Sequence, residues 1–143
     1  MKILVSSCLL GCNCKYNGSN NLNSHVINFV RDRDVIKICP EMLAGIGTPR
    51  ACAEIVNGKI VDEHGVNVDE LYRTGVMLAL KAIAGEELEL AILQSRSPTC
   101  GVNEIYDGSF TGKIIKGRGI FAQALMDAGY NVMDAADFYN LER

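Results

Sequence analysis

The sequence lacks a long apolar run and an excess of positive charge. No run approaches the roughly 18 residues that a membrane-spanning helix needs, and the best stretch, 76–80, ends at Lys81. Lys and Arg together number 14 against 17 Asp and Glu, which gives a net charge of −3 at pH 7. We therefore expect no membrane segment and no stable complex with nucleic acid. A nucleobase or nucleotide remains open as a small substrate.

Two further absences narrow the chemistry. The only histidines are His25 and His64, too few for a His-rich metal site. The glycines over 108–119 follow neither the G-x-G-x-x-G pattern after a strand nor the G-x-x-x-x-G-K-[ST] pattern, so no phosphate-binding loop is expected. The basic and apolar parts of the N-terminal segment are too short for an export signal. The expected compartment is therefore the cytoplasm, where thiols stay reduced.

Cysteine, by contrast, is abundant, with six in 143 residues. The stretch "SSCLLGCNCKYNG" holds half of them, and the others are isolated along the chain. Reduced thiols in an intracellular chain indicate metal ligation or catalysis before disulfides, although a lone free cysteine is often a small buried apolar residue. The six are Cys8, Cys12, Cys14, Cys39, Cys52 and Cys100.

Length and composition predict one compact domain over residues 1–143, because 143 residues with 48% hydrophobic content suffice for a single core and are few for two. Short apolar runs that end at small or polar residues predict strands, and apolar residues at helical spacing predict helices. The expected strands cover 2–7, 34–40, 88–95 and 131–135, with helices over 23–34, 67–87 and 119–130 and a helical turn within 135–143.

Local signals complete the expected architecture. Asn57-Gly58 between two apolar runs predicts a hairpin over 53–65. The order of elements predicts an α/β fold, a single-domain three-layer sandwich with a mostly parallel sheet and a small β-hairpin. Ser24 and Asn67 are the expected N-caps of the first two helices. We also expect a short helical turn at the start of residues 41–50 and no regular secondary structure over residues 110–119.

Three of the cysteines follow three different predicted strands. Cys8 comes after the first strand, Cys39 stands at the end of the second, next to Pro40, and Cys100 comes after the third of the parallel type. Ligands of open α/β sheets bind beyond the carboxyl ends of the strands. We therefore predict that these three thiols, although far apart in sequence, form one site.

The residues leave several chemistries open for this site. A structural zinc site usually takes four ligands that come in close pairs along the chain. Cys8 and Cys12 have the spacing of such a pair, but the sequence offers no second pair. Cys12 and Cys14 are not the C-x-x-C of a redox motif. Three thiolates would also hold three irons of a [4Fe-4S] cluster, whose full complement is four cysteines. The remaining iron would then be open to a soft sulfur ligand. An iron-sulfur or zinc binding module without turnover and a thiol-based redox protein stay open as alternatives.

Polar residues beside the cysteines are further site residues. Glu41, two residues after Cys39, is a general acid or base if it faces the site and a solvated loop residue if it does not. Arg50 would hold an anionic or polar edge of a substrate, or else form a surface ion pair.

Three hydroxyl residues precede Cys100. Ser95, Ser97 and Thr99 would donate hydrogen bonds to a cluster or position a substrate. The Ser97-Pro98 pair is equally consistent with ordinary turn chemistry.

Four stretches taken together resemble a bacterial family catalogued as domain of unknown function 523, whose characterised members are thiouracil desulfidases (TudS). The resemblance runs from residue 3 to about residue 133 and departs from the family at Thr99, where serine is commoner. Cys12 and Cys52 lie outside the family motifs, whereas Cys14 stands at a position that relatives can also fill with cysteine. The stretches are "SSCLLGCNCKYNG", "CPEMLAGIGTPR", "AILQSRSPTCG" and "IYDGSFTGKIIKGRGIFAQAL".

The resemblance implies a single α/β domain with a [4Fe-4S] cluster on Cys8, Cys39 and Cys100. It implies that the iron without a cysteine binds the sulfur of a thiolated base, and that water replaces this sulfur on carbon without net redox change. Glu41 would be the acid/base residue, assisted by Ser97 ahead of Ser95. The implied reaction converts a thiouracil to uracil with release of sulfide. Since the chain has no room for a second domain and no basic patch, we expect a free base or nucleoside rather than RNA as substrate.

Overall fold

A parallel sheet forms the centre of the molecule, whose structure is a computed structural model that describes residues 1–137. Within this range the central sheet has four strands in the order β2-β1-β5-β8, and each neighbouring pair is parallel. Ile3 on the inner strand β1 is in register with Val35 on one side and Leu90 on the other. The strands are β1 (Lys2–Ser6), β2 (Val35–Ile38), β5 (Leu88–Leu93) and β8 (Val132–Asp134).

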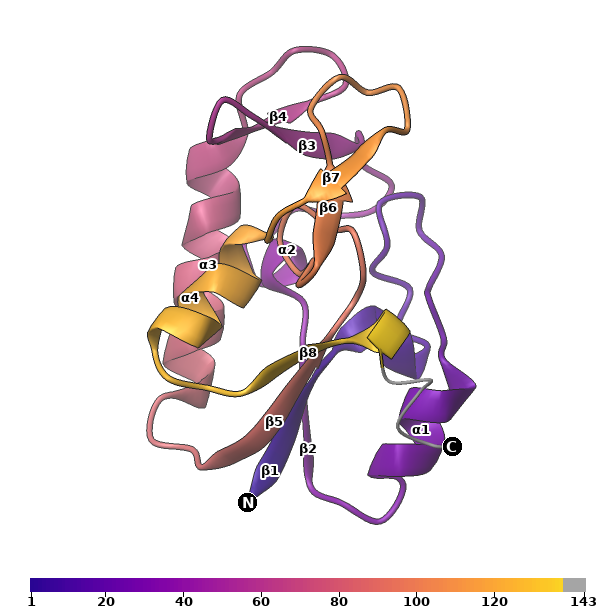
Figure 1. Cartoon of the computed structure of the whole chain (residues 1–143), viewed down its shortest axis with the longest axis vertical. Helices are drawn as coiled ribbons and strands as arrows, with labels where there is room; N and C mark the ends of the chain where they lie inside the picture. Colours follow the sequence, from indigo (N-terminus) through magenta and orange to yellow (C-terminus); the bar gives the residue numbers. More distant parts are fainter. Residues whose placement is uncertain (138–143) are drawn as a thin grey trace.

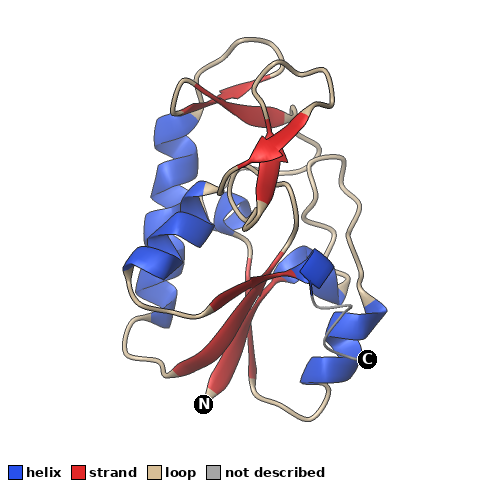
Figure 2. Cartoon of the chain, viewed as in Figure 1, coloured by secondary structure: helices blue, strands red, loops and turns tan. Residues whose placement is uncertain are grey.

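Helices cover both faces of this sheet (Figures 1 and 2). On one face lie α2 (Pro40–Leu43), α3 (Asp69–Ile83) and α4 (Ile120–Asp127); on the other lie the 3-10 helix η1 (Ser7–Leu10) and α1 (Ser24–Val30). The predicted α/β three-layer sandwich is therefore confirmed. None of the helices described over residues 1–137 has the length and apolar content to cross a membrane.

Each face of the sheet has its own apolar core. Leu4 and Leu93 pack with Val76, Ile83 and Phe121 from α3 and α4. On the opposite face Ile3, Val5 and Ile92 pack with Leu9, Val26 and Val30 of η1 and α1. Because β1 is covered on both faces, its residues Ile3 to Ser6 are all buried, and Ile3, Leu4 and Val5 form a continuous apolar run instead of an alternating one.

Two antiparallel hairpins stand at the end of the sheet where the parallel strands terminate (Figure 1). The first is the hairpin that the sequence predicted, and it joins β3 (Ala53–Val56) to β4 (Lys59–Asp62). Its turn residues, Asn57 and Gly58, both have positive φ. The second joins β6 (Glu104–Tyr106) to β7 (Ile114–Lys116). The expectation that 110–119 is irregular was wrong over β7, because a three-residue strand between glycine-rich turns carries almost no periodic signal.

Several predicted boundaries need correction. Asn23, not Ser24, caps α1, and its side-chain oxygen accepts hydrogen bonds from the N–H groups of His25 and Val26. The helix ends at Val30, because the polar residues that follow turn toward β2.

Asn67 precedes the capping position Val68 of α3 by one residue, and its side chain accepts a hydrogen bond from the N–H of Asp69. The expected helical turn at 41–50 is confirmed as α2. Residues 135–137 are helical, and the rest of the turn predicted within 135–143 lies outside the described residues.

Gly75 in the middle of α3 determines how closely α2 approaches that helix. A Cβ atom at this position would lie 2.1 Å from the carbonyl oxygen of Pro40, which is backbone and cannot rotate away. We expect Gly75→Ala to lower the free energy of unfolding by about 2 kcal/mol, since an overpacking cost of up to about 3 kcal/mol exceeds a helix-propensity gain of about 1 kcal/mol. Urea denaturation measures this change. Gly47→Ala is the matched control, because its Cβ meets nothing within 4 Å, and an equal loss in both variants would contradict the packing argument.

Candidate iron-sulfur site

Three adjacent strands bring the predicted ligand cysteines to one edge of the sheet. β1 leads directly into η1, which carries Cys8. β2 ends at the residue before Cys39, which is the N-cap of α2. β5 leads through a loop to Cys100. Because the strand order is β2-β1-β5, these three thiols lie together although they are far apart in sequence.

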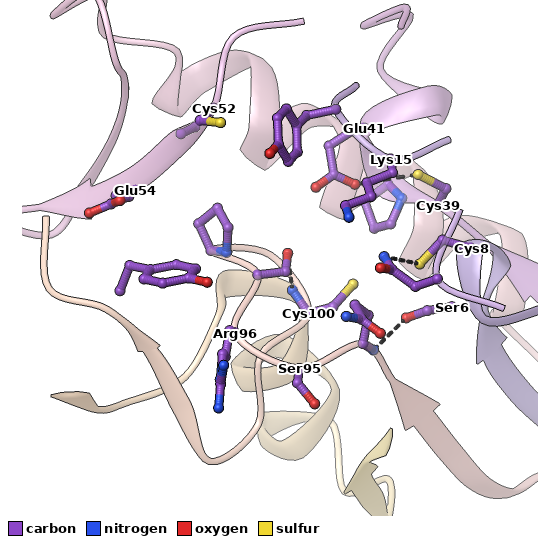
Figure 3. A pocket seen from close by; sticks show the side chains of 18 of the residues that line it. Ser6, Cys8, Lys15, Cys39, Glu41, Cys52, Glu54, Ser95, Arg96 and Cys100 are labelled. Atoms are coloured by element: carbon purple, nitrogen blue, oxygen red, sulfur yellow. Dashed lines mark hydrogen bonds between the residues drawn. The ribbon is translucent and has the colours of Figure 1, made fainter. Parts of the chain in front are cut away.

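The cysteines line a cavity of about 800 Å³ that opens between the sheet edge and the hairpins. Figure 3 shows the sulfur atoms of Cys8, Cys39 and Cys100 on one side of it, with the Glu41 carboxylate beside them. Cys52 and Glu54 lie on the opposite side of the cavity. The cavity is of the size that encloses a small organic molecule.

A fourth thiol, Cys14, also belongs to this group. Its buried side chain lines the same cavity as Cys8 and Cys39. The interactions with the thiols of Cys39 and Cys8, together with burial, raise the pKa of Cys14 well above its ordinary value. The hydrogen bond from Cys14 lowers the pKa of Cys8 to about 7, although burial opposes this, and the Asn21 side chain donates a second bond at 3.5 Å. The sequence left the role of Cys14 open, and only a contact between distant loops reveals its place.

Cys100 is the most enclosed of the predicted ligands. Burial, followed by the negative charge of Glu41, raises the pKa of its thiol well above the ordinary value. The backbone N–H of Cys100 donates to Ser97 Oγ at 3.0 Å, which fixes the turn that carries the thiol. A metal that binds Cys100 therefore has to displace its proton, as metals do when they bind cysteine.

Glu41 is buried in this site and is not the solvated loop residue that the sequence left open. Its residue exposure is 8%, and its carboxylate accepts two hydrogen bonds. Thr99 Oγ1 donates to Oε1 at 2.7 Å, and the Cys39 thiol donates to Oε2 at 3.4 Å. A buried carboxylate needs such partners, since burial without them is costly.

The two serines before Cys100 have different surroundings. Ser97 Oγ accepts hydrogen bonds from the N–H groups of Thr99 and Cys100, which is a turn-forming role beside the cavity. The Ser95 hydroxyl donates to the buried Asp134 carboxylate, and Figure 3 shows it pointing away from the cysteine sulfurs. Both serines line the cavity, and the Ser95 hydroxyl is additionally engaged by Asp134.

Arg50 lines the cavity and also holds the loop that carries Cys14. Its Nη2 donates to the Cys14 carbonyl oxygen at 2.9 Å, and its Nη1 to the Gly47 carbonyl oxygen at 3.4 Å. The alternative of a surface ion pair is not seen, since no ion pair of Arg50 occurs in the described part of the chain. Its role toward a substrate stays a prediction.

The donors that converge at this site are soft thiols, which bind zinc as well as iron-sulfur clusters. Over residues 1–137, no group of three or more His, Cys, Asp or Glu side chains is arranged as ligands of one ion. Thiolates around one zinc would each lie about 2.3 Å from it and so close to one another. The thiolates of a [4Fe-4S] cluster bind separate irons and stand farther apart. Soft thiols converging from three loops therefore fit the cluster that the sequence led us to expect.

A redox pair of Cys12 and Cys14 has no geometric support. All six cysteines lie within the described residues, where each is a free thiol. The N–H of Cys14 bonds to the Cys12 carbonyl oxygen at 2.9 Å, while the Cys14 thiol contacts Cys8 and Cys39. The structure thus groups Cys14 with the predicted ligands and not with Cys12.

Comparison with known proteins defines the class to which this fold and site belong. The family model described as 2-thiouracil desulfurase matches residues 3–137. The chain therefore belongs to the 2-thiouracil desulfurase family, and the family resemblance predicted from the sequence motifs is confirmed.

Two individual proteins are similar over almost the whole chain. The uncharacterized protein YbbK of Bacillus subtilis (strain 168) is 40% identical over 141 residues, which cover 92% of this chain and 93% of that protein. The solved structure of the [4Fe-4S]-dependent thiouracil desulfidase TudS superposes with a TM-score of 0.89 at 32% identity, covering 99% of this chain and 95% of the other.

Proposed function

We propose that this protein is a [4Fe-4S]-dependent desulfidase that converts a thiolated nucleobase of the thiouracil type to its oxo form. The substrate is the free base or its nucleoside, and sulfide is released. One observation carries the proposal: three cysteines from adjacent strand ends share a cavity with a buried glutamate, in a chain of the 2-thiouracil desulfurase family. We place the reaction in the cytoplasm, because six free thiols suit a reducing compartment.

Cys8, Cys39 and Cys100 are the residues that would hold the cluster. When bound, a cluster with three protein thiolates supplies a Lewis-acidic iron with affinity for soft sulfur. Cys14 lies beside Cys8 and Cys39, and its single S–H would donate to one of these two ligand sulfurs. Hydrogen bonds of this kind to ligand sulfurs tune a cluster.

Glu41 is the acid/base residue of the proposal. Its carboxylate takes a proton from a water molecule as the oxygen of that water forms a bond to the thiocarbonyl carbon. The carbon-sulfur bond then breaks, and the sulfur leaves with both protons of the water as hydrogen sulfide. One water is consumed for each sulfide released, so the reaction needs neither an oxidant nor a reductant.

Other residues of the cavity have orienting roles in this proposal. We place Ser97 ahead of Ser95, because the Ser95 hydroxyl is occupied by Asp134, whereas Ser97 lies in the turn that carries Cys100. Arg50 offers its guanidinium to polar atoms of the base. Aromatic side chains that line the cavity provide flat surfaces on which a planar base can stack. These residues are Tyr16, Tyr72, Tyr106 and Phe110.

The direct test is turnover by anaerobically purified and reconstituted protein. We expect about four irons and four sulfides per chain, and release of one sulfide for each 2-thiouracil or 4-thiouracil converted to uracil. Loss of thiocarbonyl absorbance and a colorimetric sulfide assay measure the two sides of this balance. Iron-loaded protein that releases no sulfide would be a binding module, and sulfide release by iron-free protein would indicate thiol chemistry; either result contradicts the proposal.

A further inference from the structure

Thr99 is completely buried, and its hydroxyl is the closest hydrogen-bond donor to Glu41. Its exposed fraction is 0%, and the distance from Oγ1 to Glu41 Oε1 is 2.7 Å. The two residues are separated by 58 positions in sequence, so the bond joins the loop that carries Cys100 to the helix that follows Cys39. A buried hydroxyl to carboxylate bond is strong, because the acceptor is charged and water is excluded.

The backbone of Thr99 is held in place from several directions. Its carbonyl oxygen accepts from the N–H groups of Phe121 at 2.8 Å and Ala122 at 3.2 Å, at the start of α4. Its own N–H donates to Ser97 Oγ at 3.0 Å. A Cβ on Gly119 would lie 2.4 Å from the Thr99 carbonyl, so α4 packs directly against this residue. The Thr99 hydroxyl is therefore a fixed donor and not a mobile one.

The other donor to Glu41 is the thiol of Cys39, at 3.4 Å from Oε2. A cysteine that ligates a metal does so as the thiolate and has no proton to donate. With Cys39 engaged as a ligand, Thr99 is the remaining donor to the Glu41 carboxylate among the described residues. Oε2 would then have lost the donor that it has here, while Oε1 would keep its bond from Thr99.

We propose that Thr99 is the positioning residue that orients the Glu41 carboxylate in the cluster-loaded enzyme, with Oε1 anchored and Oε2 available to water. This inference rests on the proposed function in giving Glu41 its catalytic role. It assigns Thr99 a task different from binding a cluster or a substrate, which is what its place beside Cys100 in the sequence suggested. The geometry accounts for threonine or serine at this position, since each provides a hydroxyl on Cβ.

Thr99→Val tests the inference, because valine keeps the shape of threonine and removes the hydroxyl. Thr99→Ser is the matched control that retains the donor. In reconstituted enzyme we expect Thr99→Val to keep its iron content and to lose about 10- to 100-fold in kcat, as misorientation of a reacting group does. KM should stay within about twofold, which separates loss of orientation from loss of binding. Thr99→Ser should retain nearly all of kcat.

A second readout does not depend on turnover. In crystals of cluster-free Cys39→Ala protein, which lacks the thiol donor, Glu41 should keep its observed orientation. In the Cys39→Ala/Thr99→Val protein the carboxylate should leave that position. An unmoved carboxylate, an unchanged kcat in iron-loaded Thr99→Val, or equal losses in the valine and serine variants would overturn the inference. Absence of turnover in the iron-loaded wild type would instead refute the proposed function, and the crystal comparison would still decide whether Thr99 orients Glu41.

Discussion

Cys39→Ala is expected to reduce the iron content of reconstituted protein from about four atoms per chain to almost none and to abolish sulfide release. Cys39 lies directly between β2 and α2, so its sulfur has no neighbour in sequence that can replace it. Loss of one of three thiolates leaves two protein ligands, too few to retain a cluster of four irons. Iron and sulfide analysis with the visible absorption spectrum measures this outcome, and Cys8→Ala and Cys100→Ala should behave in the same way.

Cys52→Ala is the matched control for this prediction. Cys52 lines the same cavity but lies on the opposite side from the other sulfurs (Figure 3). Its variant should keep both the iron and the visible absorption of the wild type. Full iron content in Cys39→Ala, or equal iron loss in Cys52→Ala, would show that the cluster is bound elsewhere.

Glu41→Gln should lower kcat by about 100- to 10,000-fold, the range that general acid-base catalysis contributes. Glutamine preserves the shape of the side chain and its ability to accept from Thr99 Oγ1, but it cannot take a proton from water. The iron content should stay at the wild-type level, because Glu41 is not among the predicted ligands. Steady-state sulfide release by reconstituted protein gives the rate, and iron analysis of the same sample confirms loading.

Glu89→Gln is a suitable control for the same chemical change. Glu89 forms an exposed ion pair with Arg33 at 3.0 Å and does not line the cavity. Exposed pairs of this kind contribute little to stability, so both rate and iron content should match the wild type. A Glu41→Gln protein that retains its iron and its wild-type kcat would remove Glu41 from the mechanism.

The sequence predicted the central elements of the fold and missed one hairpin. Ile3 to Val5 of β1 and Ala91 to Leu93 of β5 are buried, and these continuous apolar runs stand out from their surroundings. The Asn57-Gly58 turn was visible because a two-residue hairpin requires residues that tolerate positive φ. β7 was missed because its three residues are half-buried or exposed, so they show no alternation. Asn23 was missed as the α1 cap because the adjacent Ser24 is an equally favoured capping residue.

Within the site, the cysteines were easier to predict than their partners. The positions of Cys8, Cys39 and Cys100 at strand ends follow from the order of elements, since parallel strands end at one edge of a sheet. Cys14 lies in a loop without regular structure, and no local pattern indicates that its thiol contacts Cys8 and Cys39. The residues gave no surroundings for Ser95 and Ser97; the structure shows that Asp134 from β8 engages Ser95 and that Ser97 accepts from the N–H groups of Thr99 and Cys100.

The sequence by itself determined the α/β class, the cysteines that converge and the family to which the chain belongs, because strand periodicity, turn residues and motifs are local properties. The tertiary structure alone decided that Glu41 is buried, that Cys14 joins the other thiols and that Thr99 holds Glu41 across 58 residues. These are contacts between loops that the packed sheet and helices bring together. Whether two such side chains come within hydrogen-bond distance depends on how the elements pack, and the spacing of residues along the chain does not specify that packing.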